Sequence, residues 1–421
     1  MLNLFQRKML EMTEHVDKAD ILIGIASFNN ARTIGHVVKA VDAGLMKYFP
    51  DRKAVIVNSD GGSTDGTPDI VRTATHDHAA IFLSHPVYPA HRISIPYNGI
   101  PGKGSAFRAI FQKAVEMGAE ACCVVDADLR SITPEWIELL LSPIMKEGFD
   151  FVAPFYSRHK YDGTITNSIV YPMTQALYGK RIRQPIGGEF GFSGKLAAFY
   201  LTQNVWESHV ARFGIDIWMT TEAIANDFKV CQTFLGAKIH DPRDPGADLS
   251  DMLVQVVVTL FNLTEKHYEK WKGIKGSMDV PAFGFRYHVG LEPVRVNIER
   301  MLGIFRTGIR DLGPIWLKIL GSGDFGEIEA IGKLSGKAFR FPPKLWTGIL
   351  YDYAIAYHKR LISSEHLIKS LLPLYLGKTA SFIMEVEDMD NEGAEAEIER
   401  LCMEFGEKKE YLVNNWREGG A

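Results

Sequence analysis

Short apolar runs that alternate with amphipathic stretches are the feature that most limits what this chain can fold into. Four runs have the length and composition of buried strands: 21–26, 54–57, 80–84 and 121–125. Helical patterns alternate with them: one over 33–48, one from Asp65, one that ends near Met117 and one from Pro134. This alternation predicts an α/β fold with a doubly wound, mostly parallel sheet.

Polar clusters follow three of the expected strands at the point where each strand ends. They are Ser27 to Asn30, Asn58 to Asp60, and Asp126 to Asp128. In a doubly wound sheet, ligands bind beyond the carboxyl ends of the strands. We therefore expect the functional site at this edge.

Asp126-Ala127-Asp128 is a D-x-D element. Two carboxylates at the end of a buried strand can share Mg²⁺ or Mn²⁺, which in turn neutralises a diphosphate. His240, which follows a strand-like segment over 230–239, is a candidate third ligand that would favour Mn²⁺. The alternatives are two aspartates in a turn and a histidine on the surface.

Two glycine-containing segments are candidates for nucleotide contacts. Asp60-Gly61-Gly62-Ser63-Thr64-Asp65 can hold a base or ribose, or can form a turn in which Ser63 or Thr64 caps a helix. Pro101-Gly102-Lys103-Gly104 precedes a helix, where anions are favoured, or is a plain loop. The spacing is not that of a Walker P-loop, and no G-x-G-x-x-G follows the first strand, which argues against an NTPase and a dinucleotide-binding enzyme.

The second part of the chain has a different pattern. After about residue 285 helical patterns dominate, over 293–310, 343–360, 365–376 and 393–416. We expect an N-terminal helix over 1–19, an α/β domain over 20–285, and a helical C-terminal domain over 286–421 that packs on the first domain or forms an oligomer interface.

Composition limits the location and the partners. The four cysteines form no C-x-x-C pair, which is typical of reduced residues in a cytoplasmic protein. A net charge of -4 gives no reason to expect a nucleic acid or an anionic membrane as partner. No apolar run is long enough to cross a bilayer.

The motifs in their order resemble a known family. IASFNN, NSDGGSTDGT, PGKG and VDAD, between Ile25 and Asp128, resemble the nucleotide-binding half of GT-A glycosyltransferases. DADLRSITPEW, RQPIGGE, FGID and the late His240 extend the resemblance over roughly residues 20–275. They are similar to the retaining enzymes that make glycosylglycerates: mannosylglycerate synthase, glucosylglycerate synthase and glucosyl-3-phosphoglycerate synthase.

The resemblance implies a role for each candidate residue. Glu189 and Asp216 would be the catalytic carboxylates, with Asp216 nearest the reacting centre. The donor would bind at Ala26, Phe28, Asn30, Asp60, Lys103, Asp126, Ala127 and Asp128. The metal would bind at Asp126, Asp128 and His240. The acceptor would bind at Arg158, Asp162, Gly163, Thr164, Thr166 and Gly187.

The segment RHKYDGTIT bears on the acceptor. Arg158 can clamp a carboxylate, and Asp162 and Thr166 can take hydroxyls. The phosphoglycerate enzymes have Gly-Arg-x-Thr here, whereas this chain has Gly163-Thr164-Ile165-Thr166, which favours D-glycerate over 3-phosphoglycerate. The loop after the first strand lacks the usual proline and acidic residue, so GDP and UDP donors of glucose or mannose both remain open.

These observations predict a metal-dependent, retaining hexosyltransferase that acts on D-glycerate, as a homodimer. The alternatives are a glucosyl-3-phosphoglycerate synthase, an inverting family-2-type transferase in which Asp216 is the base, and a non-catalytic sensor of sugar nucleotides.

Overall fold

The computed structural model describes residues 17–74, 91–96, 100–239, 250–286 and 294–417. The chain forms two compact units. Unit 1 comprises Met1–Ser157, Ile186–Asp241 and Val280–Gly290, and unit 2 comprises Arg158–Pro185, Pro242–Asp279 and Leu291–Ala421.

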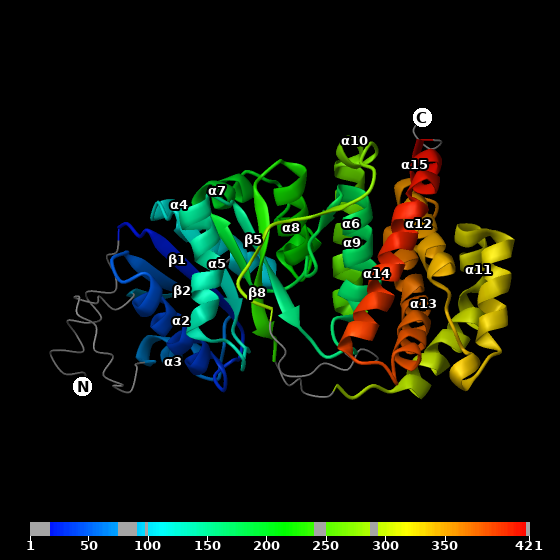
Figure 1. Ribbon diagram of the computed structural model, residues 1–421, viewed down its shortest axis with the longest axis horizontal. Helices are drawn as coiled ribbons and strands as arrows, with labels where there is room; N and C mark the ends of the chain where they lie inside the picture. Colours follow the sequence, from blue (N-terminus) through cyan, green and yellow to red (C-terminus); the bar gives the residue numbers. More distant parts are fainter. Residues whose placement is uncertain (1–16, 75–90, 97–99, 240–249, 287–293, 418–421) are drawn as a thin grey trace. The chain divides into compact units, whose positions relative to one another are not determined.

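The centre of unit 1 is an eight-stranded sheet in the order β10-β8-β5-β7-β4-β1-β2-β3 (Figure 1). The strands are β1 (Ile21–Ser27), β2 (Ala54–Asp60), β3 (His91–Pro96), β4 (Ala121–Asp126), β5 (Phe151–Ser157), β7 (Phe190–Ser193), β8 (Val230–Ala237) and β10 (Ala282–Phe283). All pairs are parallel except those that β7 makes with β4 and β5. The mostly parallel, doubly wound sheet predicted from the sequence is therefore confirmed.

Helices α2 (Ile34–Tyr48) and α5 (Pro134–Glu147) pack on one face of this sheet. Ile21, Ile23 and Ile25 of β1 alternate towards this face and join one core cluster with the buried side chains of both helices. This is the period of two that a strand imposes on its side chains. Helix α3 (Thr67–Thr73) follows β2 and lies beside α2.

Helices α4 (Lys103–Glu116), α7 (Gly194–Leu201) and α8 (Ile215–Ala225) complete unit 1. Helix α4 lies against β1 and β2 and approaches the strand backbone closely at Gly24. A Cβ at Gly24 would lie 2.5 Å from Cγ2 of Ile110, so only glycine lets the helix come this near. The approach fixes α4 and, with it, the position of its first residue, Lys103.

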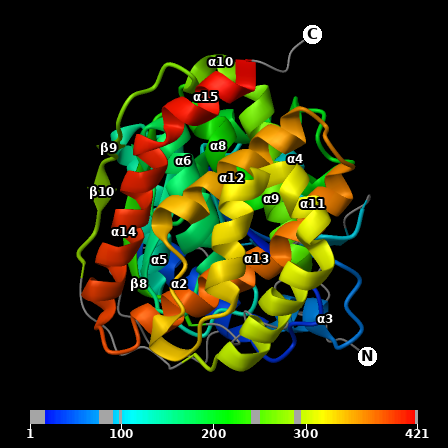
Figure 2. The same ribbon diagram turned by 90° about the vertical axis from the view of Figure 1, so that its right-hand side faces the viewer.

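Unit 2 is mainly helical, and in Figure 2 its helices α11, α12 and α13 face the viewer. Its helices are a π-helix (Thr166–Val170), α6 (Tyr171–Tyr178), α9 (Ser250–Lys266), α10 (Tyr268–Trp271), α11 (Ile298–Gly332), the short 3₁₀ helix Gly336–Ala338, α12 (Pro343–His358), α13 (Ser364–Glu385), α14 (Asn391–Glu407) and α15 (Lys409–Arg417). A two-stranded sheet pairs β6 (Lys180–Arg181) with β9 (Met278–Asp279). Helix α11 is kinked at Gly321, which has a φ of 75°.

The structure differs from the sequence-based expectations in several places. Strand β3 occupies residues 91–96, where no strand was predicted, while the predicted strand 80–84 and most of the predicted helix 1–19 lie outside the described residues. The pattern over 393–416 is two helices, and the helix expected over 293–310 continues to Gly332.

The compact units do not divide at a single point near residue 285. Helix α9 packs on α12 and α13, and α6 packs on α14, so 158–185 and 242–279 group with the C-terminal helices. Among the described residues, no helix combines the length and apolar character that crossing a membrane requires.

Candidate functional site

Asp60 is held in one orientation at the carboxyl end of β2. Its Oδ2 accepts hydrogen bonds from the backbone N–H groups of Gly62 (3.0 Å) and Ser63 (2.8 Å). Its Oδ1 lies 2.9 Å from Ser27 Oγ and 2.6 Å from Ser63 Oγ. The expected helix after this turn begins at Thr67 with Gly66 as N-cap, so neither Ser63 nor Thr64 caps it.

The end of β1 lies beside Asp60. In the sheet register Ala26 is opposite Ser59 on β2 and opposite Asp126 on β4, so the three predicted strand ends meet at one edge. The side chain of Asn30 accepts a hydrogen bond from the backbone N–H of Phe28 (2.8 Å). Phe28 is 62% exposed, so a large aromatic side chain at this edge lies mostly in solvent and not in the core.

Lys103 joins two of the predicted carboxylates. Its ammonium lies 2.9 Å from Asp126 Oδ1 and 3.2 Å from Asp216 Oδ1. The start of α4 is fixed because a Cβ at Gly104 would lie 1.8 Å from the carbonyl oxygen of Val210. The second glycine of PGKG therefore serves close packing, and the lysine faces the acidic site.

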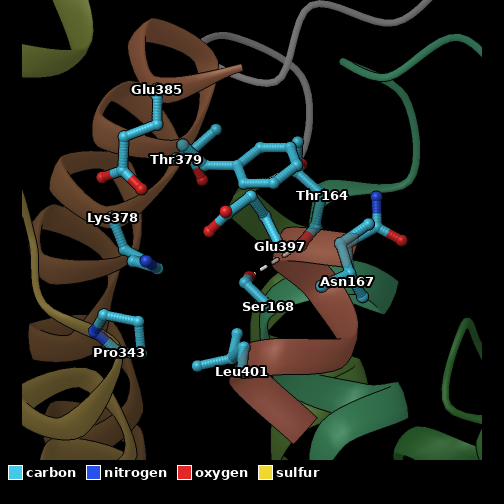
Figure 3. Close-up of a pocket in the computed structure, with 11 residues that line it drawn as sticks. Thr164, Asn167, Ser168, Pro343, Lys378, Thr379, Glu385, Glu397 and Leu401 are labelled. Carbon is cyan, nitrogen blue, oxygen red and sulfur yellow. Dashed lines mark hydrogen bonds between the residues drawn. The ribbon is translucent and has the colours of Figure 1, made fainter. Parts of the chain in front are cut away.

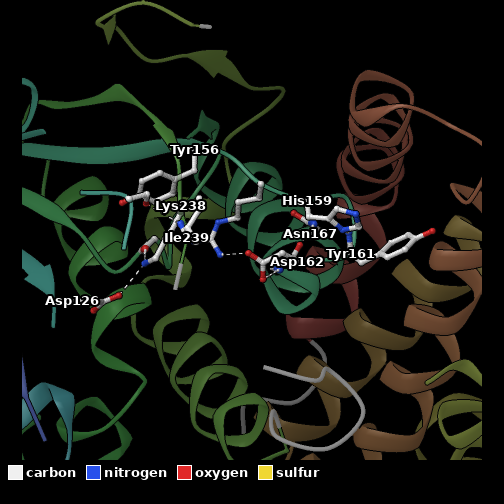
Figure 4. Close-up of polar contacts among 12 residues, drawn as sticks. Asp126, Tyr156, His159, Tyr161, Asp162, Asn167, Lys238 and Ile239 are labelled. Atoms are coloured by element: carbon white, nitrogen blue, oxygen red, sulfur yellow. Dashed lines mark hydrogen bonds and ion pairs between the residues drawn. The ribbon is translucent and has the colours of Figure 1, made fainter. Parts of the chain in front are cut away.

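Lys238 is a site residue that the sequence analysis missed. Its side chain is 5% exposed, and Nζ lies 2.9 Å from Asp126 Oδ2 and 2.8 Å from Glu189 Oε1 (Figure 4). Nζ also donates to the carbonyl oxygen of Gly187 at 2.8 Å, and the Tyr156 hydroxyl donates to Glu189 Oε2. One signal was available, since Lys238 is a charged residue directly after the apolar strand β8.

Gly188 allows this cluster to close. It has a φ of +97°, in the left-handed region that side chains rarely adopt. A Cβ here would lie 2.5 Å from Asp126 Oδ2 and 2.7 Å from Lys238 Nζ. The glycine of RQPIGGE is thus required both by the backbone and by the two charged neighbours.

Burial and neighbouring charges shift the pKa values of these groups in opposite directions. Burial raises the pKa of Glu189 to about 8, against the opposing effect of Lys238, and burial also raises the pKa of Asp216. For Asp126 burial acts in the same sense, but the ammonium groups of Lys103 and Lys238 outweigh it and hold the pKa well below its usual range. Burial would lower the pKa of Lys103, yet Asp126, Asp216 and Glu189 together raise it. Asp126 therefore stays ionised, whereas Glu189 and Asp216 retain a proton to higher pH than ordinary carboxyl groups do.

The predicted metal ligands are in different situations. Asp128 is half-buried, and within the described part of the chain its carboxylate has no polar partner. Both oxygens of Asp126 contact a lysine, and Ala127 is buried with its carbonyl bonded to Thr33 Oγ1 (2.8 Å). His240 lies outside the described residues, and those that are described contain no group of three or more metal-binding side chains.

Most of the predicted acceptor residues belong to unit 2 and come together in one loop. Arg158 Nη1 lies 3.1 Å from Asp162 Oδ2, and Gly163 N donates to Asp162 Oδ1 at 2.7 Å. A Cβ at Gly163 would lie 3.8 Å from Arg158 Cδ and 3.9 Å from Thr166 Cβ. Thr166 begins the π-helix, an irregularity that is frequent at functional sites. Gly187 belongs to unit 1.

The fold and the site define a class: an α/β protein with a doubly wound sheet that gathers carboxylates and lysines at its carboxyl edge. Residues 22–199 match the model of the family described as Glycosyl transferase family 2. The predicted fold class, a GT-A sheet with a helical C-terminal region, is thereby confirmed.

Comparison with known proteins gave further similarities. A solved structure of glucosyl-3-phosphoglycerate synthase from Mycobacterium tuberculosis with Mg²⁺ and uridine-diphosphate has 21% identity, covering 61% of this chain and 83% of that chain, with a TM-score of 0.43. Another, with Mn²⁺, uridine-diphosphate-glucose and phosphoglyceric acid, has 21% identity, 63% and 85% coverage, and a TM-score of 0.43. A mycobacterial protein has 19% identity, 62% and 78% coverage, and the same TM-score. No curated protein matches the chain.

Proposed function

We propose that this protein is a retaining hexosyltransferase that moves glucose or mannose from a nucleoside diphosphate sugar to D-glycerate. The observation that carries the proposal is the cluster of Lys103, Asp126, Glu189, Asp216 and Lys238 at the carboxyl edge of the sheet. The match of residues 22–199 to the family 2 model supports it. Such an edge is where doubly wound sheets bind their ligands. The D-glycerate part rests on the loop residues and on the family resemblance of the motifs.

The donor nucleotide would lie over the ends of β1 and β2. The fixed Asp60 carboxylate can accept hydrogen bonds from a ribose or a base, since its orientation is set by two backbone N–H groups. The exposed Phe28 ring offers a surface on which a base can stack. Lys103 would then attract the diphosphate, with its positive charge maintained by Asp126 and Asp216.

A divalent metal fits this edge through Asp128. Its half-buried carboxylate offers oxygen ligands of the kind that Mg²⁺ and Mn²⁺ prefer. We propose Asp128 and His240 as ligands, and Asp126 as the residue that orients Lys103 and Lys238, because each of its oxygens already contacts an ammonium group. The metal would neutralise the charge of the diphosphate when bound.

The acceptor would bind at the loop that begins with Arg158. The guanidinium can clamp the carboxylate of D-glycerate. The Asp162 carboxylate can accept hydrogen bonds from the hydroxyls of D-glycerate, and the Thr166 hydroxyl can donate to them or accept from them. In transfer, the bond between the sugar's anomeric carbon and the phosphate oxygen breaks and a bond to the acceptor hydroxyl forms. The hydroxyl proton passes to the departing phosphate oxygen. Asp216 in its ionised form would stabilise the positive charge on the sugar, and Glu189 would hold Lys238 beside it.

An inverting transferase is the second candidate, and the family 2 match favours it. Here Asp216 would be the general base, a role that its raised pKa suits. The two candidates differ in one product property, because the retaining reaction keeps the anomeric configuration of the donor sugar and the inverting reaction reverses it.

The test measures nucleotide release with Mg²⁺ or Mn²⁺ from GDP- and UDP-glucose and from GDP- and UDP-mannose, each with D-glycerate or 3-phosphoglycerate. Turnover with D-glycerate and little with 3-phosphoglycerate is the expected result. Turnover with 3-phosphoglycerate alone would contradict the acceptor assignment, and nuclear magnetic resonance of the product decides between retention and inversion.

A further inference from the structure

Lys160 lies within the proposed acceptor loop but faces a different part of unit 2. Its ammonium lies 2.7 Å from each of three backbone carbonyl oxygens, those of Val386, Glu387 and Met389. Val386 is the C-cap of α13, and Glu387 and Met389 lie in the turn that follows this helix. An ammonium group has three protons, and here each proton has one acceptor.

A second contact fixes the same loop a few residues further on. Thr164 Oγ1 lies 2.6 Å from the hydroxyl of Tyr375 in α13, and both side chains are buried. The next turn is held too, because Ser168 Oγ donates to the carbonyl of Thr164 (2.7 Å) and Trp346 Nε1 of α12 donates to the carbonyl of Ser168 (2.7 Å). The loop is therefore attached to the C-terminal helices on both sides of Asp162 and Gly163.

The surroundings of the second contact are mixed in character. Figure 3 shows Thr164, Asn167 and Ser168 on one side of a small pocket, with Lys378 and Thr379 of α13 on the other. Apolar side chains, among them Phe382, Ile398 and Leu401, also line this pocket. The contacts of Lys160 and Thr164 are thus direct polar links between the loop and the helices, beside a region that packing does not fill completely.

The proposed acceptor residues depend on this attachment. Asp162 contacts Arg158 and the backbone N–H of Gly163. Both partners belong to the same loop, so they would move together with Asp162. A contact inside a loop does not fix the loop itself, whereas contacts with a long helix do. Loss of the attachment would spread Arg158, Asp162 and Thr166 over many arrangements, of which few bind an acceptor.

We propose that Lys160, together with Tyr375, is a positioning residue for the acceptor, through which the C-terminal helices hold the acceptor loop in its binding conformation. This gives the helical C-terminal region a role in acceptor recognition. The inference rests on the proposed function, because it assigns the loop at Arg158 to the acceptor.

The experiment compares three single variants with the wild-type protein. K160M removes the ammonium and keeps the length of the side chain, and Y375F removes only the hydroxyl. K337M is the matched control, since Lys337 pairs with Asp388 in the segment that follows α13, but both side chains are about 80% exposed. The apparent Michaelis constants for acceptor and donor, kcat, and backbone hydrogen exchange over 158–168 are measured for each.

The expected result is a split between the two substrates. K160M should raise the KM for D-glycerate about tenfold, which corresponds to about 1.4 kcal/mol, while the KM for the sugar nucleotide stays within about twofold. Hydrogen exchange over the loop should accelerate by a similar factor in K160M, to a smaller extent in Y375F, and not in K337M. A residue that only capped α13 would change thermal stability without this split.

Four results would overturn the inference. If K160M turned over at the wild-type rate with an unchanged KM for the acceptor, the inference would be wrong while the proposed function would stand. Unchanged hydrogen exchange over the loop in K160M would have the same consequence. Equal increases in acceptor and donor KM would show that the loop does not serve the acceptor specifically. A wild-type protein that transfers to neither D-glycerate nor 3-phosphoglycerate would overturn the proposed function, and the inference with it.

Discussion

Replacing Lys238 by methionine is the perturbation that most directly tests the buried charge cluster. The ammonium contacts Asp126, Glu189 and the carbonyl of Gly187 at 2.8–2.9 Å, and Glu189 is fully buried. Removing one partner of a buried ion pair costs about 3–5 kcal/mol, because the other charge stays buried without compensation. At pH 9, above the Glu189 pKa of about 8, this carboxyl group is ionised in the wild type and can take up a proton in the variant, so we expect a cost near the lower end, about 3 kcal/mol.

A double-mutant cycle with E189Q separates this coupling from a simple loss of packing. At the same pH of 9, where Glu189 is ionised, glutamine removes the charge that the ammonium compensates, so the loss of stability in K238M/E189Q should be smaller than the sum of the two single losses by about 1–3 kcal/mol. The free energies of unfolding come from urea titrations followed by tryptophan fluorescence. The control is K195M, whose ammonium is 3.9 Å from Asp150 and whose side chain is 75% exposed, with an expected effect within about 0.5 kcal/mol.

Two results would refute the reasoning about the cluster. Additive single losses would mean that Lys238 and Glu189 do not stabilise one another. If K238M lost no more free energy of unfolding than K195M, the close contacts of the Lys238 ammonium would make no net contribution to stability.

Three further predictions concern the metal, the backbone and pH. D128N should reduce metal-stimulated turnover by a factor of 100 or more and weaken Mn²⁺ binding in a titration. The free energy of unfolding should not change, because the side chain is only half-buried. Full activity of D128N would contradict the ligand assignment. G188A should cost about 1–3 kcal/mol and weaken donor binding measured by calorimetry, because its Cβ would meet Asp126 and Lys238; binding equal to that of the wild type would contradict this. Burial raises the pKa of Asp352 from its usual 3.8 to about 6, so its protonated form stabilises the fold below pH ~4 and this contribution is lost as pH rises through 6. D352N should therefore gain up to about 3 kcal/mol over the wild type between pH 4 and pH 7 in urea titrations, and a difference that does not change with pH would contradict the shift.

The sequence predicted the site-bearing strands because their signals are local. The apolar runs at Ile21, Ala54 and Ala121 each end in polar residues, and the sheet register brings these ends together as expected for neighbouring parallel strands. Strand β3 was missed because HRISIP contains two charged or titratable residues and a proline, a composition that resembles a loop. Its pairing with β2 outweighs this local preference.

The charge cluster was harder to predict because it depends on contacts between distant residues. Lys238 and Asp126 are 112 positions apart in the sequence, and the residues around Lys238 do not identify Asp126 as its partner. Glu189 and Asp216 came from the resemblance of their motifs, since a single carboxylate in a glycine-containing turn is usually structural. The contacts that tie the C-terminal helices to the loop at Lys160 have the same long-range origin.

The transfer of hexose to D-glycerate is the central claim, and one measurement tests it most directly. The purified protein is incubated with Mn²⁺, D-glycerate and each of the four sugar nucleotides, and nuclear magnetic resonance detects the glycosidic product and its anomeric configuration. We predict a hexosyl-glycerate with the configuration of the donor sugar, formed by the wild type and not by D128N. An inverted product would contradict the retaining mechanism, and the absence of any hexosyl-glycerate with all four donors would contradict the acceptor assignment.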